Sequence, residues 1–204
     1  MCRVDYGEGN SSPLLKVMNK YNHIIDYKDV TADSTVTEPV TVQECKDWLR
    51  LEGFTDDSDS TSPDFDDDDT FIDMLITSAR ERLEEYTGLS LVPKTWEVEL
   101  TNLAGYIELP FGPVVDITSV EDTDGNSLDY TTTNNLSKLK TPIQANIIVT
   151  YDAGYSTAPN WLKHGLLTEV AYRYTHRGDE ELRGLCQDAL NIVSPYKSVN
   201  SWLQ

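Results

Sequence analysis

The sequence predicts an α+β protein in which a helical bundle, built from two flanking helix pairs, carries an inserted small antiparallel β-sheet domain. Apolar residues recur at helical spacing before residue 88 and after residue 159, and alternate with a period of two between residues 95 and 155. Short amphipathic helices need partners to bury their apolar faces, so the two flanks are expected to pack together. We expect an N-terminal extension or arm (1–35), a helical core with a docking tail (36–92 and 156–204) and an inserted β domain (93–155).

Two helices are predicted before the sheet. Thr41 and Glu44 form a capping-box sequence that begins the first, and Gly53 ends it. The second begins with a similar pair, Thr70 and Asp73. It ends at a glycine, and its Arg80 and Glu84 are spaced to form an ion pair across one turn. Its apolar stripe consists of Ile72, Leu75, Ile76, Ala79, Leu83 and Tyr86, with Gly88 as the terminating residue. Farther upstream, residues 23–27 are compatible with a strand.

The central region predicts strands. Trp96, Val98 and Leu100 alternate with polar residues, as in a half-buried strand. Further short strands are expected at residues 106–109, 114–121, 128–130 and 147–151, with Asp124-Gly125 as a hairpin turn. Helical spacing returns after Pro159, a favourable first helical residue. Two stripes follow, Leu162, Leu166, Val170 and Tyr174, then Leu182, Leu185, Cys186, Ala189 and Val193, ended by Gly178 and Pro195.

Charge is distributed unevenly along the chain. The net charge is −19, and residues 51–79 contain ten acidic residues and no lysine or arginine. Residues 159–204 contain five of each sign and are neutral. An acidic surface repels DNA phosphates rather than binding them. The simplest interpretation of the acidic stretch is a solvated loop that keeps the protein soluble.

Motifs for catalysis or metal binding are absent. The sequence has no Gly-rich phosphate loop, nucleophile elbow or His-Glu-x-x-His helix. The histidines (His23, His164, His176) and the cysteines (Cys2, Cys45, Cys186) lack ligand spacing, and Cys45 and Cys186 fall on apolar helix stripes. We therefore predict no catalytic residue, cofactor or metal site. No run of 18 apolar residues exists and the N-terminus has no apolar signal region, so we expect no membrane partner and synthesis in the cytoplasm.

Calcium binding is the alternative that the acidic residues leave open, because calcium prefers oxygen ligands at alternating positions. Two stretches have such alternation: Asp57, Asp59 and Thr61, and Asp122, Asp124 and Asn126. The first departs from an EF-hand loop, with Ser62 at the glycine position and Asp68 at the twelfth. The second is more simply a hairpin turn. The competing hypothesis is therefore a calcium-dependent soluble binding module with Asp-rich loops.

The order of several short motifs resembles one known family. The motifs are Glu38-Pro39-Val40-Thr41, Trp48-Leu49-Arg50, the run Asp66–Asp69, Glu85-Tyr86-Thr87-Gly88, Thr95-Trp96, Leu109-Pro110-Phe111-Gly112-Pro113-Val114, Tyr151-Asp152-Ala153-Gly154-Tyr155 and Pro195-Tyr196-Lys197. Over residues 38–197 the chain resembles the head–tail connector proteins of tailed bacteriophages, also called adaptor or head-completion proteins. The first 35 residues lie outside the resemblance.

The resemblance implies a structural virion protein rather than an enzyme. It would form a homo-oligomeric ring, typically a dodecamer, beneath the portal protein in the neck between capsid and tail, after synthesis in the host bacterial cytoplasm. The ring would extend the DNA channel, pass double-stranded DNA without specific binding, and offer a platform to a downstream neck, stopper or tail protein. The resemblance places portal binding on the C-terminal helix and tail, here Leu190, Ile192, Val193, Tyr196, Lys197, Val199, Trp202 and Leu203. Lys197 stands where an arginine is expected, which removes a bidentate contact.

The acidic stretch gains a role in this context. A channel that passes DNA should not hold it, and carboxylates on its wall avoid the strong phosphate binding of lysine and arginine. We therefore expect channel-lining positions among Asp56, Asp57, Asp59, Asp66, Asp67, Asp68 and Asp69.

Overall fold

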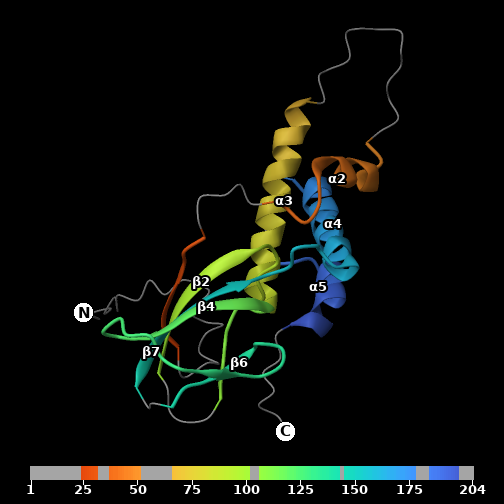
Figure 1. The fold of residues 1–204 in the computed structure, drawn as a ribbon. Helices are drawn as coiled ribbons and strands as arrows, with labels where there is room; N and C mark the ends of the chain where they lie inside the picture. The colour runs from red at the N-terminus through yellow and green to blue at the C-terminus, as the bar shows by residue number, and fades with distance from the viewer. Residues whose placement is uncertain are drawn as a thin grey trace, which may run out of the picture.

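The computed structural model describes residues 24–31, 37–51, 66–101, 106–142, 145–177 and 184–197. Helices gather on one side of the molecule and strands on the other, and the long helix α3 (Asp66–Thr87) runs from one part to the other (Figure 1). The remaining helical elements are α2 (Val42–Leu49), α4 (Asn160–Thr175), α5 (Gln187–Val193) and the 3₁₀ helix η1 (Ser194–Tyr196).

The strands form two antiparallel sheets within the described residues. The strands are β1 (Ile24–Asp29), β2 (Lys94–Thr101), β3 (Ile107–Glu108), β4 (Val114–Asp122), β5 (Thr131–Thr132), β6 (Lys138–Lys140) and β7 (Asn146–Ala153). One sheet has the order β1-β2-β7-β4 and the other β3-β6-β5. In the larger sheet Trp96 pairs with Tyr151 and Val98 with Val149, and all four are buried. The predicted alternation of strand β2 is thus confirmed.

The helical bundle of two flanking helix pairs was a wrong prediction, although the α+β composition is confirmed. β1 precedes all the described helices and forms an edge of the larger sheet, so strand structure is not confined to the segment between two helix pairs. The second predicted pair is also unequal, because α4 has 16 residues and α5 only 7. Periodicity shows which residues are helical, but a strand's distant partner depends on tertiary packing. The domain boundaries remain a prediction.

The apolar core has two parts. In the helical part, Ile72, Ile76, Ala79 and Leu83 of α3 pack with residues of α2, α4 and α5. The second part lies between the sheets, where Leu100, Leu139 and Ile147 are fully buried. An ionic junction connects the parts. It consists of Glu38, Arg80, Glu84 and Lys94, which join the segment before α2, the C-terminal half of α3 and the start of β2.

Most of the predicted local signals are confirmed. Thr41 and Glu44 make both hydrogen bonds of a capping box at α2, and Arg80 pairs with Glu84 at 3.0 Å. Gly88 ends α3 with a φ of 70°, and its amide donates to the carbonyl of Glu84. Such a left-handed residue is favourable for glycine. These signals succeed because each depends on neighbouring residues in the chain.

Several predicted boundaries were wrong. α3 begins at Asp66, one turn before Thr70, so Thr70 is helical and is not a cap. Pro159 is the residue before α4 rather than its first. Residues 128–130, which were expected to form a strand, do not form one. The preceding residue, Ser127, makes an isolated bridge to Glu121. α5 begins at Gln187, so Leu185 and Cys186 precede it. α2 ends at Leu49 with Arg50 as its left-handed C-cap, so Gly53 does not end this helix. Gly53, Gly178 and Leu182 themselves lie outside the described residues.

Candidate functional site

The predicted portal-binding residues begin on α5, which lies close against α4. Gly165 of α4 makes this approach possible, because a Cβ at that position would stand 2.7 Å from Val193 Cγ1. Val193 is fully buried, whereas Leu190 and Ile192 are half-buried. Within this chain Val193 therefore anchors α5, and the other two leave part of their surface available.

An aromatic cluster lies where α5 passes into η1. Tyr196 stacks on Trp161 of α4 with ring centroids 4.1 Å apart and ring planes within 8°. Tyr155 meets the edge of Trp161 at 6.2 Å, and Lys197 Nζ lies 4.2 Å from the ring centre of Tyr86 on α3. We call these five residues the C-terminal aromatic cluster. Tyr196 remains 44% exposed, and burial raises the pKa of Tyr155.

The cluster joins residues that the sequence separates widely, and it brings together two of the predicted portal-binding residues, Tyr196 and Lys197. Large aromatic side chains that are ordered but still exposed are favourable contact residues, because little side-chain entropy remains to be lost on binding. Val199, Trp202 and Leu203 lie outside the described residues. The chain leaves the described structure at this cluster.

A buried ion pair holds the connection between α4 and α5. Glu169 is fully buried, and its Oε1 accepts a hydrogen bond from Arg173 Nε at 2.6 Å. Its Oε2 accepts from the amide of Cys186 at 2.8 Å, and Arg173 also donates to the carbonyl of Gly184. Sequence reasoning missed this pair. The signal was present, since Glu169 and Arg173 are four residues apart on a helix.

Of the predicted channel-lining residues, the structure describes the side chain of Asp69 alone. It forms an ion pair with Lys46 of α2, and 40% of its side chain is exposed. The backbones of residues 66–68 form the first turn of α3, where carboxylates are favoured by the helix dipole. Asp56, Asp57 and Asp59 lie outside the described residues. The position of these residues relative to a channel stays a prediction.

The second alternating acidic stretch forms a turn. Asp122 Oδ1 accepts hydrogen bonds from the amides of Asp124 and Asn126, and its Oδ2 accepts from the Asn126 side chain. The Asn126 side-chain and backbone hydrogen bonds lower the pKa of Asp122. Its oxygens are therefore occupied by the turn itself. Among the described residues, no group of three or more His, Cys, Asp or Glu is placed to hold a metal ion.

A cleft of about 530 Å³ lies between α3 and the larger sheet. Its lining includes Glu81 and Glu85 of α3, Lys94 and Trp96 of β2, and Phe111. Trp96 and Phe111 stack at 4.3 Å, which provides an apolar floor beneath a charged rim. The separate sequence signals for α3 and β2 did not predict this cleft, because it exists only where the two elements meet.

Chains with this fold are present in solved structures of gene transfer agent (GTA) particles. The chain superposes on a protein in the neck of an empty GTA particle, computed with C6 symmetry, with a TM-score of 0.65 and 18% identity. The match covers 88% of this chain and 99% of that one. A chain from the virion of a native GTA particle matches with a TM-score of 0.62 and 17% identity, over 88% and 99%.

A third match is to the neck of a native GTA particle computed with C12 symmetry. It has a TM-score of 0.53 and 15% identity, and covers 84% of this chain and 99% of that one. At these identities the likeness establishes the fold. No protein-family model matches the sequence, and no curated protein matches it. None of the helices in the described residues is both long enough and apolar enough to cross a membrane.

Proposed function

We propose that this protein is a head–tail connector, or adaptor, in the neck of a phage-like particle. It would form a ring beneath the portal protein, extend the DNA channel, and join the head to a downstream neck, stopper or tail protein. The observation that carries this proposal is the fold, which is shared over 99% of the length of proteins in GTA necks and virions. The neck particles were computed with C6 and C12 symmetry, which supports a ring.

The C-terminal aromatic cluster supports the portal-binding part of the proposal. Its two C-terminal members, Tyr196 and Lys197, lie where the chain continues towards Val199, Trp202 and Leu203. Tyr196 and Lys197 are held by contacts with Trp161 of α4 and Tyr86 of α3. Leu190 and Ile192 add partly exposed apolar surface beside it. We infer that these residues bind the portal, with Val193 supporting them from the core.

The charge of the chain supports a role in passing DNA rather than binding it. The net charge is −19, and a ring of such subunits repels the phosphate backbone from its wall. We propose that the acidic residues from Asp56 to Asp69 face the channel. The ion pair with Lys46 neutralises Asp69 in part, so the preceding acidic residues would contribute most of the potential.

The test is a portal-binding assay with matched variants. Tyr196 and Tyr130 are 44% and 41% exposed, but Tyr130 lies near the smaller sheet. The full chain, Y196A and Y130A would be incubated with the portal protein of the same particle, and complexes counted by negative-stain electron microscopy. We expect Y196A to weaken portal binding by about tenfold or more, as for an interface aromatic, while Y130A binds normally.

Two results would contradict the proposal. Equal binding by Y196A and Y130A would exclude the C-terminal aromatic cluster from the portal interface. Absence of any complex between the full chain and the portal would exclude the connector role itself. Circular dichroism of both variants ensures that a loss of binding does not reflect loss of the fold.

A further inference from the structure

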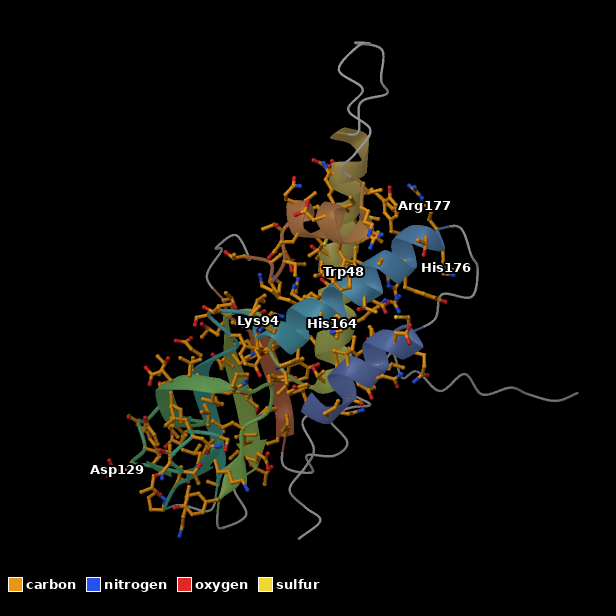
Figure 2. All side chains as sticks on the ribbon, turned by 90° about the vertical axis from the view of Figure 1, so that its right-hand side faces the viewer. Trp48, Lys94, Asp129, His164, His176 and Arg177 are labelled. Carbon is orange, nitrogen blue, oxygen red and sulfur yellow. The ribbon has the colours of Figure 1, made fainter. Side chains whose placement is uncertain are left out.

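The outer side of α4 forms an exposed face with little negative charge. His164, Thr168 and Tyr172 follow one another at intervals of four residues, so they lie in one row along α4, and His176, the C-cap residue, continues this row. Trp48 of α2 lies beside this row, 5.7 Å from the ring of His164, and is 48% exposed. We call these five residues the α4 face. Figure 2 shows Trp48, His164 and His176 on the same side of the molecule.

The exposed side of α4 has no carboxylate, although the chain as a whole is strongly acidic. Glu169 is the one carboxylate within α4, and it is fully buried and paired with Arg173. Lys163 lies on the same helix and is paired with Glu44 of α2. Arg177 follows the end of α4, but its guanidinium lies over the rings of Tyr174 and Phe71, and the exposed Asp47 precedes Trp48 on α2. The five residues of the α4 face include no carboxylate, so this face is a near-neutral surface with a large exposed tryptophan, a combination that is typical of a protein interface.

A second face, on α3, has the opposite character. Thr70, Met74, Ser78, Glu81 and Glu85 occupy the side of α3 opposite Ile72, Ile76, Ala79 and Leu83, which pack towards α4. We call the first five residues the α3 face. Met74 is 56% exposed, and the Glu81 side chain is 65% exposed, although it lies 4.0 Å from the Arg80 guanidinium. The α3 face thus has an apolar centre and two carboxylates one turn apart. Beside it is the cleft lined by Trp96 and Phe111, to which Arg82 and Lys94 also contribute.

The two faces lie on opposite sides of the helical layer. α4 packs on the buried side of α3, and the view in Figure 2 has α4 in front of α3. Two different complementary surfaces on opposite sides of one subunit make a heterologous contact, which closes into a ring when the rotation per subunit is suitable. A contact between identical patches would instead stop at a dimer.

We propose that the α4 face of one copy of this chain docks against the α3 face of the next copy. The inference rests on the proposed ring function and names the surfaces that would build the ring. Trp48 would supply the aromatic contact, Met74 would pack against the His164–Tyr172 row, and Glu81 and Glu85 would face the acid-free side of α4. Two α3 faces would bring Glu81 and Glu85 of one copy against the same carboxylates of another, whereas the α4 face has no carboxylate, and this difference would disfavour pairing between two α3 faces.

A charge exchange between the faces tests the proposal. E81K/E85K makes the α3 face basic, and H164E/T168E makes the α4 face acidic. The combined variant E81K/E85K/H164E/T168E gives the two faces opposite charges. D124K/D129K, on exposed positions of the sheet region, is the control with the same change in charge as E81K/E85K. Self-association of each variant would be measured by native mass spectrometry and sedimentation velocity up to about 1 mM, where even weak contacts are populated.

We expect the wild type and the control to form the same oligomers, and H164E/T168E to associate at least about tenfold more weakly, because carboxylates then face carboxylates. The combined variant should recover association. W48A should weaken association by about tenfold or more, as for a hot-spot tryptophan, while Y130A, of similar exposure, should not.

Three results would overturn the proposal. They are a wild type that stays monomeric at the highest concentration, oligomers in H164E/T168E equal to those of the wild type, and a combined variant that does not recover association. The portal-binding assay described above distinguishes these failures from failure of the connector role, since a chain that binds the portal through Tyr196 but lacks this subunit contact would bind without self-associating.

Discussion

Replacement of Arg80 by methionine should destabilise the junction between the helical part and the sheet. Arg80 Nε donates to Glu38 Oε2 at 2.8 Å, and its Nη1 donates to Glu84 Oε2 at 3.0 Å. Burial lowers the pKa of the guanidinium, but the hydrogen bond to Glu38 and the charges of Glu84 and Glu38 more than compensate, so its pKa is raised. R80M would leave these carboxylates without their shared cation.

The size of the effect follows from burial. The Arg80 side chain is 6% exposed, and those of Glu38 and Glu84 are 17% and 13% exposed. Removal of one partner from a buried ion pair costs about 3–5 kcal/mol. Lys94 still holds Glu84 at 2.8 Å, and both carboxylates retain some solvent contact, so we expect a loss of about 2–4 kcal/mol. For a chain of this length the loss lowers Tm by about 5–15 °C.

Urea unfolding followed by circular dichroism would measure the change. R82M is the matched control, because Arg82 lies two residues farther along α3 and is only half-buried; it should cost no more than about 0.5 kcal/mol. E38Q/R80M should recover about 1 kcal/mol or more relative to R80M, because one uncompensated charge is removed. Equal stabilities for R80M and R82M would refute the assigned role of the junction.

Two further predictions concern the elements around the site. G154A should lower the free energy of unfolding by about 3 kcal/mol or more, because Gly154 has a φ of +110° and a Cβ there would lie 2.1 Å from the Val92 carbonyl oxygen. The control G125A, at a φ of +82° with no atom near its Cβ, should lower it by about 1–2 kcal/mol in the same urea assay. Equal losses for the two variants would contradict the clash at Gly154. The hydrogen bond from Lys163 lowers the pKa of Glu44 below its ordinary 4.5. The stability that ionised Glu44 gives the fold is therefore present above pH 4.5 and is lost as the pH falls through the pKa of the folded state. The urea midpoints of wild type and K163M should therefore differ at pH 7 and converge on acidification, and a gap independent of pH would exclude this mechanism.

Much of the local structure could be predicted because its causes are local. The capping box of Thr41 and Glu44, the Arg80–Glu84 pair and the terminating Gly88 all involve residues within one helical turn of each other. The alternation of Trp96, Val98 and Leu100 likewise needs only the geometry of one strand. The predicted start of α3 was too late because Thr70 was predicted as the N-cap, whereas the helix already begins at Asp66 and includes the preceding aspartates.

The wrong fold prediction has a different cause. β1 joins the sheet by pairing with β2, which is far away in the sequence. The alternation within a strand does not indicate which distant strand it will pair with. The C-terminal helix was predicted too long because its stripe included Leu182, Leu185 and Cys186, whereas α5 begins at Gln187 with Cys186 as its cap. In both cases, contacts made elsewhere in the molecule decided the outcome.

The candidate site at the C-terminal segment was also predictable only in part. The neutral charge of the C-terminal segment and its Tyr196 and Trp202 predicted an interface there, and the order of the short motifs resembles that of phage connector proteins. The stacking of Tyr196 on Trp161, the position of Lys197 over Tyr86 and the burial of Val193 were not predictable, because three separate elements meet there.

The sequence by itself determined the helix and strand periods, the caps, the uneven charge and the order of short motifs that resembles phage connector proteins. These properties depend on neighbouring residues or on composition, which the chain carries whatever its fold. Only the tertiary structure decided the pairing of β1 with β2, the ionic junction at Arg80, and the placement of the α3 and α4 faces on opposite sides. Those features depend on which distant residues are brought together when the apolar surfaces of the helices and sheets are buried.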